Sequence, residues 1–176
     1  MKKTIKINIL FLLVFTIIAL TAVSCSISYK FNGSSIDYSK TKTISISDFP
    51  NTAELIYPPL SAAFSEGLRD VYSKQTRLQL LKKGGDMHLE GEIVGYQLTP
   101  MSVTADSYAS ETKLTMTVKV RFTNNKNPDD DFEKSYSAFQ TFDNTKNMLQ
   151  DVQEQLMTTM VADITDQIYN DTVAKW

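Results

Sequence analysis

The sequence predicts an α+β domain: a two-layer sandwich with two helices packed on one face of a mainly antiparallel, four- to five-stranded sheet. Segments of alternating hydrophobicity, typical of half-buried strands, fill the middle of the chain. One stretch near residue 60 and another at the C-terminal end instead repeat apolar residues every three or four positions, as amphipathic helices do. No βαβ alternation and no internal repeat competes with this interpretation.

The first predicted elements are a strand and a helix. Residues 41–48 alternate, so that Ile44 and Ile46 share one face. A helix is predicted from Pro59, because proline is favoured in the first helical turn. Its apolar stripe consists of Leu60, Phe64, Leu68 and Val71. Gly67 lies on the same face, where we expect the helix to approach the sheet closely.

Two further strands are predicted at residues 77–81 and 87–98. Gly84 and Gly85 lie between them, and a double glycine is a hairpin signal. The apolar residues of the second strand change phase along its length. We therefore expect a bulge or bend near Gly95.

The clearest strand covers residues 113–123. Its apolar face consists of Leu114, Met116, Val118, Val120 and Phe122. We expect Val118 and Val120 to lie in the core, facing both helices. A polar turn follows, and residues 132–142 continue as an antiparallel strand with Phe139 out of phase.

The last element is a helix from about residue 147 to residue 174. Its stripe consists of Leu149, Val152, Leu156, Met160, Ile164 and Ile168. Such a helix would be about 40 Å long. Because that is as long as a domain of this size is wide, we expect a kink or a frayed end.

The first 24 residues predict a lipoprotein signal peptide. Three lysines precede an uncharged apolar run from residue 7 to residue 20, which is too short to span a bilayer comfortably. Small residues then lead into Cys25, the only cysteine. This resembles a bacterial lipobox, although Ala22 replaces the usual leucine. The resemblance implies that Cys25 is acylated, palmitate being one such acyl group, and becomes the first mature residue; the alternative is a transmembrane anchor with an incidental cysteine.

The predicted mature chain has one domain and a tether. Residues 25–40 lack any period and predict a lipidated tether, and residues 41–176 form the single α+β domain. Residues 1–24 contain three of the 18 basic residues and none of the 20 acidic ones, so the mature net charge is about −5. Nucleic acid is therefore not expected as a partner. No acidic run follows Cys25, which favours a periplasm-facing anchor.

No catalytic residue, metal ligand or cofactor is predicted. His88 is the only histidine, and no serine-nucleophile motif accompanies it, so we interpret it as a solvated strand residue. The acidic cluster at residues 129–131 lacks the spacing of a calcium loop. Gly84 and Gly85, with Lys82 and Lys83, resemble a phosphate cradle only superficially, because they join two strands and open no helix.

Three cations are the candidate binding residues. Lys113, Lys119 and Arg121 lie on the polar face of one predicted strand, where residues two apart are ~7 Å from each other. They could bind phosphates. The alternative is an ordinary solubilising face of an antiparallel sheet.

The mature chain also resembles the LPS-assembly lipoprotein family, LptE, in its Bacteroidota form. The matching features, in order, are Cys25 followed by Tyr29-Lys30-Phe31-Asn32-Gly33, Ile44-Ser45-Ile46, Phe49-Pro50-Asn51, Pro59-Leu60-Ser61, and Gly85-Asp86 leading into Leu89, Gly91, Ile93 and Tyr96.

The resemblance implies a non-enzymatic partner of the LptD β-barrel in the outer membrane, anchored by lipid and facing the periplasm. Such a protein helps the barrel to assemble and lipopolysaccharide (LPS) to reach the outer leaflet. In this family, basic residues on the sheet are thought to contact lipid A phosphates. Two alternatives remain: a binding or pilotin-like lipoprotein that chaperones another outer-membrane complex, and an enzyme of unfamiliar design.

Overall fold

The computed structural model describes residues 36–101 and 111–174. The predicted signal peptide, Cys25 and the loop at 102–110 lie outside the described residues. The elements in chain order are β1 (Thr43–Ile46), α2 (Pro59–Gln75), β2 (Gln79–Leu81), β3 (Met87–Pro100), β4 (Glu111–Asn124), a 3-10 turn (Pro128–Asp130), β5 (Phe132–Asp143) and α3 (Leu149–Thr172). Ile36 and Tyr38, at the C-terminal end of the predicted tether, pack against the core.

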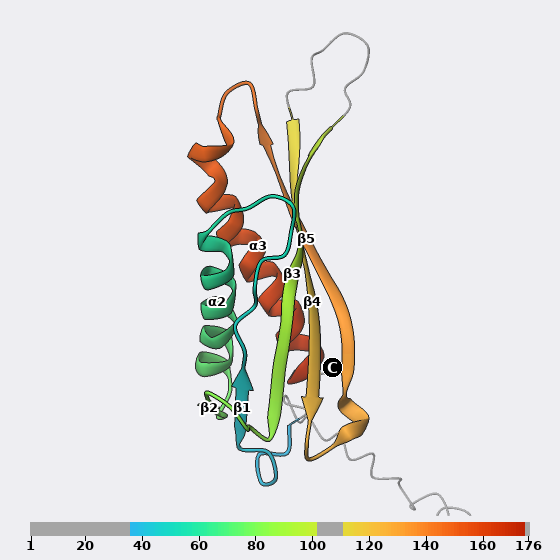
Figure 1. The fold of residues 1–176 in the computed structure, drawn as a ribbon. Coiled ribbons are helices and arrows are strands. Elements are labelled where there is room, and N and C mark those ends of the chain that lie inside the picture. Colours follow the sequence, from blue (N-terminus) through green and yellow to red (C-terminus); the bar gives the residue numbers. More distant parts are fainter. Residues whose placement is uncertain (1–35, 102–110, 175–176) are drawn as a thin grey trace, which may run out of the picture. The chain divides into compact units, whose positions relative to one another are not determined.

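The five strands form one sheet in the order β2-β1-β3-β4-β5. The long pairs β3–β4 and β4–β5 are antiparallel, whereas β1 runs parallel to both β2 and β3. Both helices cover the same side of this sheet (Figure 1). The predicted two-layer α+β class and the mainly antiparallel sheet are therefore confirmed.

The predicted hairpin between β2 and β3 is wrong, because β1 lies between these two strands. The connecting residues 82–86 instead pass across β1. A side chain at Gly85 would lie 2.6 Å from the backbone nitrogen of Ser45 and 2.7 Å from the carbonyl oxygen of Met87. Gly84 has φ +75°, in the left-handed region that favours glycine. The double glycine thus permits a close crossing of the chain over a strand.

The phase change in β3 is confirmed. The register with β4 shifts between Ile93 and Gly95, which is a β-bulge. Because the bulge adds one residue, both Ile93 and Tyr96 face the helices and are buried, while Val94 is 40% exposed.

Helix α2 begins at Pro59, as predicted, and buries one residue per turn against the sheet. These are Leu60, Phe64, Leu68 and Tyr72. Tyr72 replaces Val71 as the last residue of the stripe, since Val71 is only half-buried. Gly67 faces the other helix rather than the sheet, because a side chain there would come within 2.9 Å of Cγ1 of Val161. The predicted close approach therefore exists, but its partner is α3.

Helix α3 buries the C-terminal part of its predicted stripe. The core side chains are Met157, Met160, Val161, Ile164 and Ile168. Near its end, the hydroxyl group of Thr172 forms a hydrogen bond with that of Tyr72 in α2. Burial raises the pKa of Tyr72, so the phenol stays neutral and holds the two helices together.

The core lies between the helices and the inner face of the sheet. All five apolar residues of the predicted inner face of β4, from Leu114 to Phe122, are 0% exposed. The predicted placement of Val118 and Val120 is confirmed. The opposite face, which we call the outer face, takes no part in this core.

Candidate functional site

The outer face carries charged side chains on three adjacent strands. Strand register places Glu92 beside Lys119 and Glu90 beside Arg121, on β3 and β4. On the other side of β4, Glu133 of β5 lies opposite Arg121. The two cations are therefore flanked by carboxylates.

These groups form ion pairs. The Nζ atom of Lys119 lies 2.6 Å from Oε1 of Glu133. The Arg121 guanidinium donates to Oε2 of Glu133 at 3.0 Å and lies 3.5 Å from Oε1 of Glu90. Hydrogen bonds from Lys119 and then Arg121 hold the pKa of Glu133 below its ordinary value. A phosphate that approached this pair of cations would compete with a carboxylate already bound to both.

The third predicted cation lies elsewhere. Lys113 is six residues from Lys119 on the same strand, or about 20 Å along it. Its ammonium group lies 5.4 Å from the centre of the Phe139 ring. The structure thus brings together Lys119 and Arg121 but not Lys113. That the three residues bind lipid A phosphates stays a prediction.

A hollow of about 390 Å³ lies over the paired cations, and we call it the acidic hollow. Its charged lining residues are Asp48, Glu90, Glu92, Glu133, Lys119 and Arg121. Carboxylates outnumber cations, so this hollow is a poor site for an anion.

A second hollow, of about 450 Å³, lies beside the chain crossing over β1, and we call it the donor hollow. It is lined by Ser45, Ser47, Lys83, Gly84, Gly85, His88, Thr123 and Asn125. No carboxylate is among these residues. The sequence alone does not reveal this site, although Lys83, Gly84 and Gly85, which form one wall, belong to its conspicuous lysine and glycine segment.

His88 is held in place at the edge of the donor hollow, and is less solvated than predicted. Its Nδ1 atom lies 2.8 Å from Oγ of Ser45, and its Nε2 atom lies 3.4 Å from Oε2 of Glu90. A serine, a histidine and a carboxylate in contact are the parts of a hydrolytic triad. Ser45 is only 1% exposed, however, and the Gly85 amide also donates to its oxygen. A substrate carbonyl could not reach it, so the arrangement orients His88.

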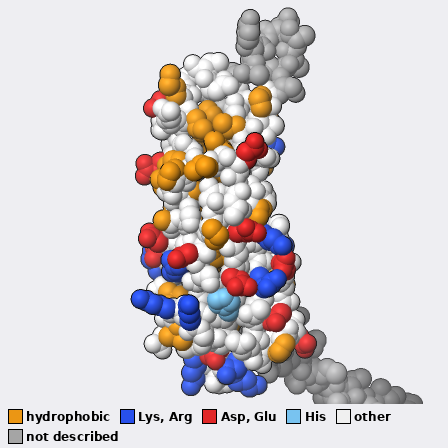
Figure 2. All heavy atoms as spheres, viewed as in Figure 1, with side chains coloured by type: hydrophobic (Ala, Val, Ile, Leu, Met, Phe, Trp, Pro, Cys, Tyr) orange, Lys and Arg blue, Asp and Glu red, His pale blue; other side chains and the backbone are white. Residues whose placement is uncertain are grey.

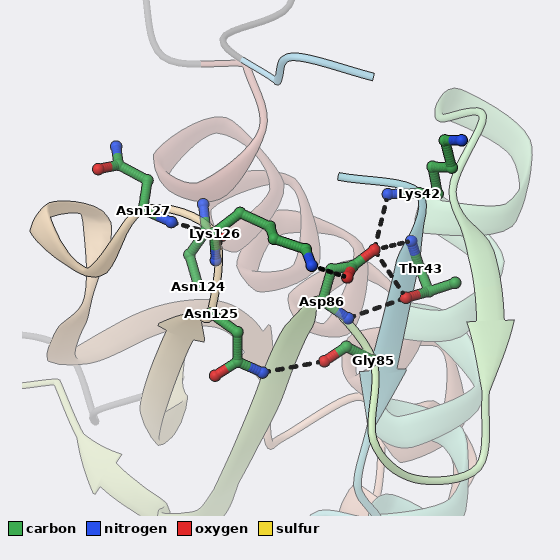
Figure 3. A network of polar contacts seen from close by, with 8 residues as sticks. All are labelled: Lys42, Thr43, Gly85, Asp86, Asn124, Asn125, Lys126 and Asn127. Carbon is green, nitrogen blue, oxygen red and sulfur yellow. Dashed lines mark hydrogen bonds and ion pairs between the residues drawn. The ribbon is translucent and has the colours of Figure 1, made fainter. Parts of the chain in front are cut away.

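A polar network fixes the ends of β1, β3 and β4 beside the donor hollow (Figure 3). The Asp86 carboxylate accepts hydrogen bonds from the backbone N–H groups of Lys42 and Thr43, at 2.9 and 3.1 Å, and from the Thr43 hydroxyl. Lys126 lies 3.1 Å from the same carboxylate. The Lys42 amide first, and then Lys126, lower the pKa of Asp86 to about 2. Asp86 is therefore committed to this network rather than to the hollow.

The upper part of the domain differs in character. In the view of Figure 2, acidic and basic side chains are mixed over the lower part, and apolar side chains gather on the upper part. The exposed large apolar residues are Ile56, Val94, Leu98, Met101, Phe139 and Met148.

Residues 36–101 and 111–174 contain neither a membrane-spanning helix nor a metal-binding cluster. No helix there is long and apolar enough to span a bilayer. In the same ranges, no three His, Cys, Asp or Glu side chains gather as they would around a metal ion.

Comparison with known proteins gives the chain its family. No curated protein matches it. A hypothetical protein from Chlamydia trachomatis is similar in structure, with 14% identity and a TM-score of 0.52 over 75% of this chain and 98% of that one. Rare lipoprotein B from Shewanella oneidensis is similar with 12% identity and a TM-score of 0.50 over 73% and 92%.

At such identities the two structures support the fold alone. A family model provides the stronger finding, because the one described as LptE, Lipopolysaccharide-assembly, matches residues 41–172. That span contains every described helix and strand. The chain therefore belongs to the LptE family.

Proposed function

We propose that this protein is an outer-membrane lipoprotein that assists assembly of the LptD β-barrel and delivery of LPS to the outer leaflet. The family match over residues 41–172 is the observation that carries the proposal. The protein is proposed to be non-enzymatic, to face the periplasm and to use no cofactor. The Bacteroidota form of the family is part of the same proposal.

The arrangement of the sheet is compatible with this role. Both helices use the inner face, so the outer face is free of core packing, and β5 is the last strand of the sheet among the described residues. The β5 segment from Ser135 to Phe142 has no charged residue. An uncharged edge strand can pair with an extended segment of another protein, as a barrel partner would offer.

Affinity purification tests the partner. The full chain, tagged at its C-terminus and extracted from membranes with detergent, should copurify with a large β-barrel. Depleting the chain should then reduce both the assembled barrel and surface LPS. Copurification of a different outer-membrane complex, with normal surface LPS on depletion, would favour the pilotin-like alternative instead.

The lipid anchor is proposed separately, from the small-residue segment before Cys25. We expect mass spectrometry of the membrane-extracted protein to show a chain that begins at Cys25 and carries added acyl mass. Cys25→Ala should release the protein from the membrane fraction, and Ser26→Ala is the matched control. A mature chain that starts elsewhere, or a Cys25→Ala protein that stays membrane-bound, would contradict this.

A further inference from the structure

We propose that the donor hollow binds a phosphate group, and that Lys83, rather than the paired cations of β4, supplies the charge. The two hollows on the outer face differ in the charge of their linings. Ser47 lines both, so they are neighbours. The acidic hollow has four carboxylates around two cations, and the donor hollow has a lysine and no carboxylate.

The cation of the donor hollow is uncommitted. Within the described residues Lys83 makes no ion pair, whereas Lys119 and Arg121 share Glu133. A phosphate at Lys83 would thus gain a charge-assisted hydrogen bond without displacing a carboxylate.

The hollow also offers neutral donors. The hydroxyl groups of Ser47 and Thr123 make no hydrogen bond to another described residue, and both line the hollow. A side chain built at Gly84 would meet nothing within 4 Å, so a ligand can approach this part of the backbone closely.

The other polar groups of the lining hold its shape. Asn125 donates to the carbonyl oxygen of Gly85 at 3.1 Å, and Ser45 orients the His88 ring. Two neighbouring acids have other partners: Glu90 contacts Nε2 of His88, and Asp86 binds the start of β1 and Lys126. The wall is thereby fixed before a ligand arrives, which reduces the entropic cost of binding.

The size of the hollow indicates what carries the phosphate. About 450 Å³ is within the range of small-molecule sites and exceeds a single phosphate, so a phosphorylated sugar headgroup would fit. The identification of that headgroup with lipid A rests on the proposed function, whereas the phosphate site itself does not.

The first experiment uses inorganic phosphate. The ¹⁵N-labelled full chain in detergent is titrated with phosphate, and with chloride at equal ionic strength, while amide signals are followed by NMR. We expect saturable shifts at Gly84, Gly85 and Thr123 with phosphate only. Lys83→Gln should weaken binding about tenfold or more, the value of one charge-assisted bond.

Lys82→Gln is the matched control. It removes the same charge from the neighbouring position, but Lys82 does not line the hollow. It should leave phosphate binding within about twofold, because an exposed charge outside the site acts only through screened attraction. Equal weakening by both variants, or the absence of a saturable response in the hollow, would overturn the proposal.

The second experiment separates the two sources of phosphate. Binding of lipid A is compared with binding of the same lipid A after enzymatic removal of its phosphates. If Lys83→Gln weakens only the phosphorylated form, the ligand is the lipid headgroup. If it weakens inorganic phosphate but not lipid A, the site stands and its ligand is a soluble phosphate. Copurification of the barrel is measured on the same variants, so failure of the proposed function is detected independently.

Discussion

Strand β4 presents alternate side chains to two environments. Towards the helices, the five residues from Leu114 to Phe122 are 0% exposed. Towards solvent, the side chains of Lys119 and Arg121 are 50% and 58% exposed and contact carboxylates on neighbouring strands. The inner row is held by burial of apolar surface, and the outer row by ion pairs that water and salt weaken. We therefore expect the inner row to determine stability and the outer face to determine binding.

The largest expected effect is on the inner row. Val120→Asp would bury an unpaired carboxylate among apolar side chains, which costs roughly 3 kcal/mol or more, enough to prevent stable folding. Thr115→Asp places the same charge on the outer face of the same strand and should cost about 1 kcal/mol or less. Thermal unfolding of the two proteins measures the difference. If Val120→Asp melts like the parent, the two faces do not differ as described.

Most of the fold could be predicted because its signals are local. Apolar residues at every second position fix the two faces of β4, and apolar residues at every third or fourth position fix the stripes of α2 and α3. Neither pattern depends on the neighbouring elements. The bulge at Gly95 was also predicted, since a change of phase is visible within one strand.

What could not be predicted depends on contacts between distant segments. Gly84 and Gly85 do mark a sharp change of chain direction, but turn residues do not specify which strands pair. Strand β1 lies between β2 and β3, where a hairpin would need them to be neighbours. The partner of Gly67 was missed for the same reason. The donor hollow combines β1, the 82–86 connection, β3 and β4, so no single stretch of sequence contains its pattern.

An intermediate effect is expected at Asp86, a polar residue outside the core whose partners lie more than 35 positions away. Its pKa is about 2 in the folded protein, below its ordinary value of 3.8. A lowered folded-state pKa adds stability above the unfolded value, and this is lost as pH falls towards the folded value. The unfolding free energy should thus decrease between about pH 4 and pH 2, and less steeply in Asp86→Asn.

Asp143 provides the control for that prediction. Its pKa is also lowered to about 2, but by Thr145 and Lys146, which are two and three residues away. Such local contacts can persist in the unfolded chain and then add little to stability. Urea unfolding at several pH values in this range gives the slope of unfolding free energy against pH. Asp86→Asn should change that slope more than Asp143→Asn does. Equal changes would mean that the distant contacts of Asp86 do not form.

The smallest effect on stability is expected for Lys119→Gln combined with Arg121→Gln. Their pairs with Glu90 and Glu133 are exposed and screened by salt, so the melting temperature should change little. The effect on LPS binding is the informative result. If the sequence-based prediction holds, binding of LPS to the full chain in detergent falls by about tenfold or more, because each lost phosphate contact is charge-assisted.

The structure favours the other outcome: both cations are already bound to Glu133, so we expect less than a tenfold loss of LPS binding, smaller than the loss that Lys83→Gln produces. The comparison needs LPS binding, melting temperature and barrel copurification on the same proteins. A loss of copurification alone would make the outer end of β4 a surface for the barrel partner. A loss of LPS binding larger than that of Lys83→Gln would return the phosphate site to Lys119 and Arg121. A large fall in melting temperature would show instead that the ion pairs of the outer face, and not only the inner row, hold this sheet together.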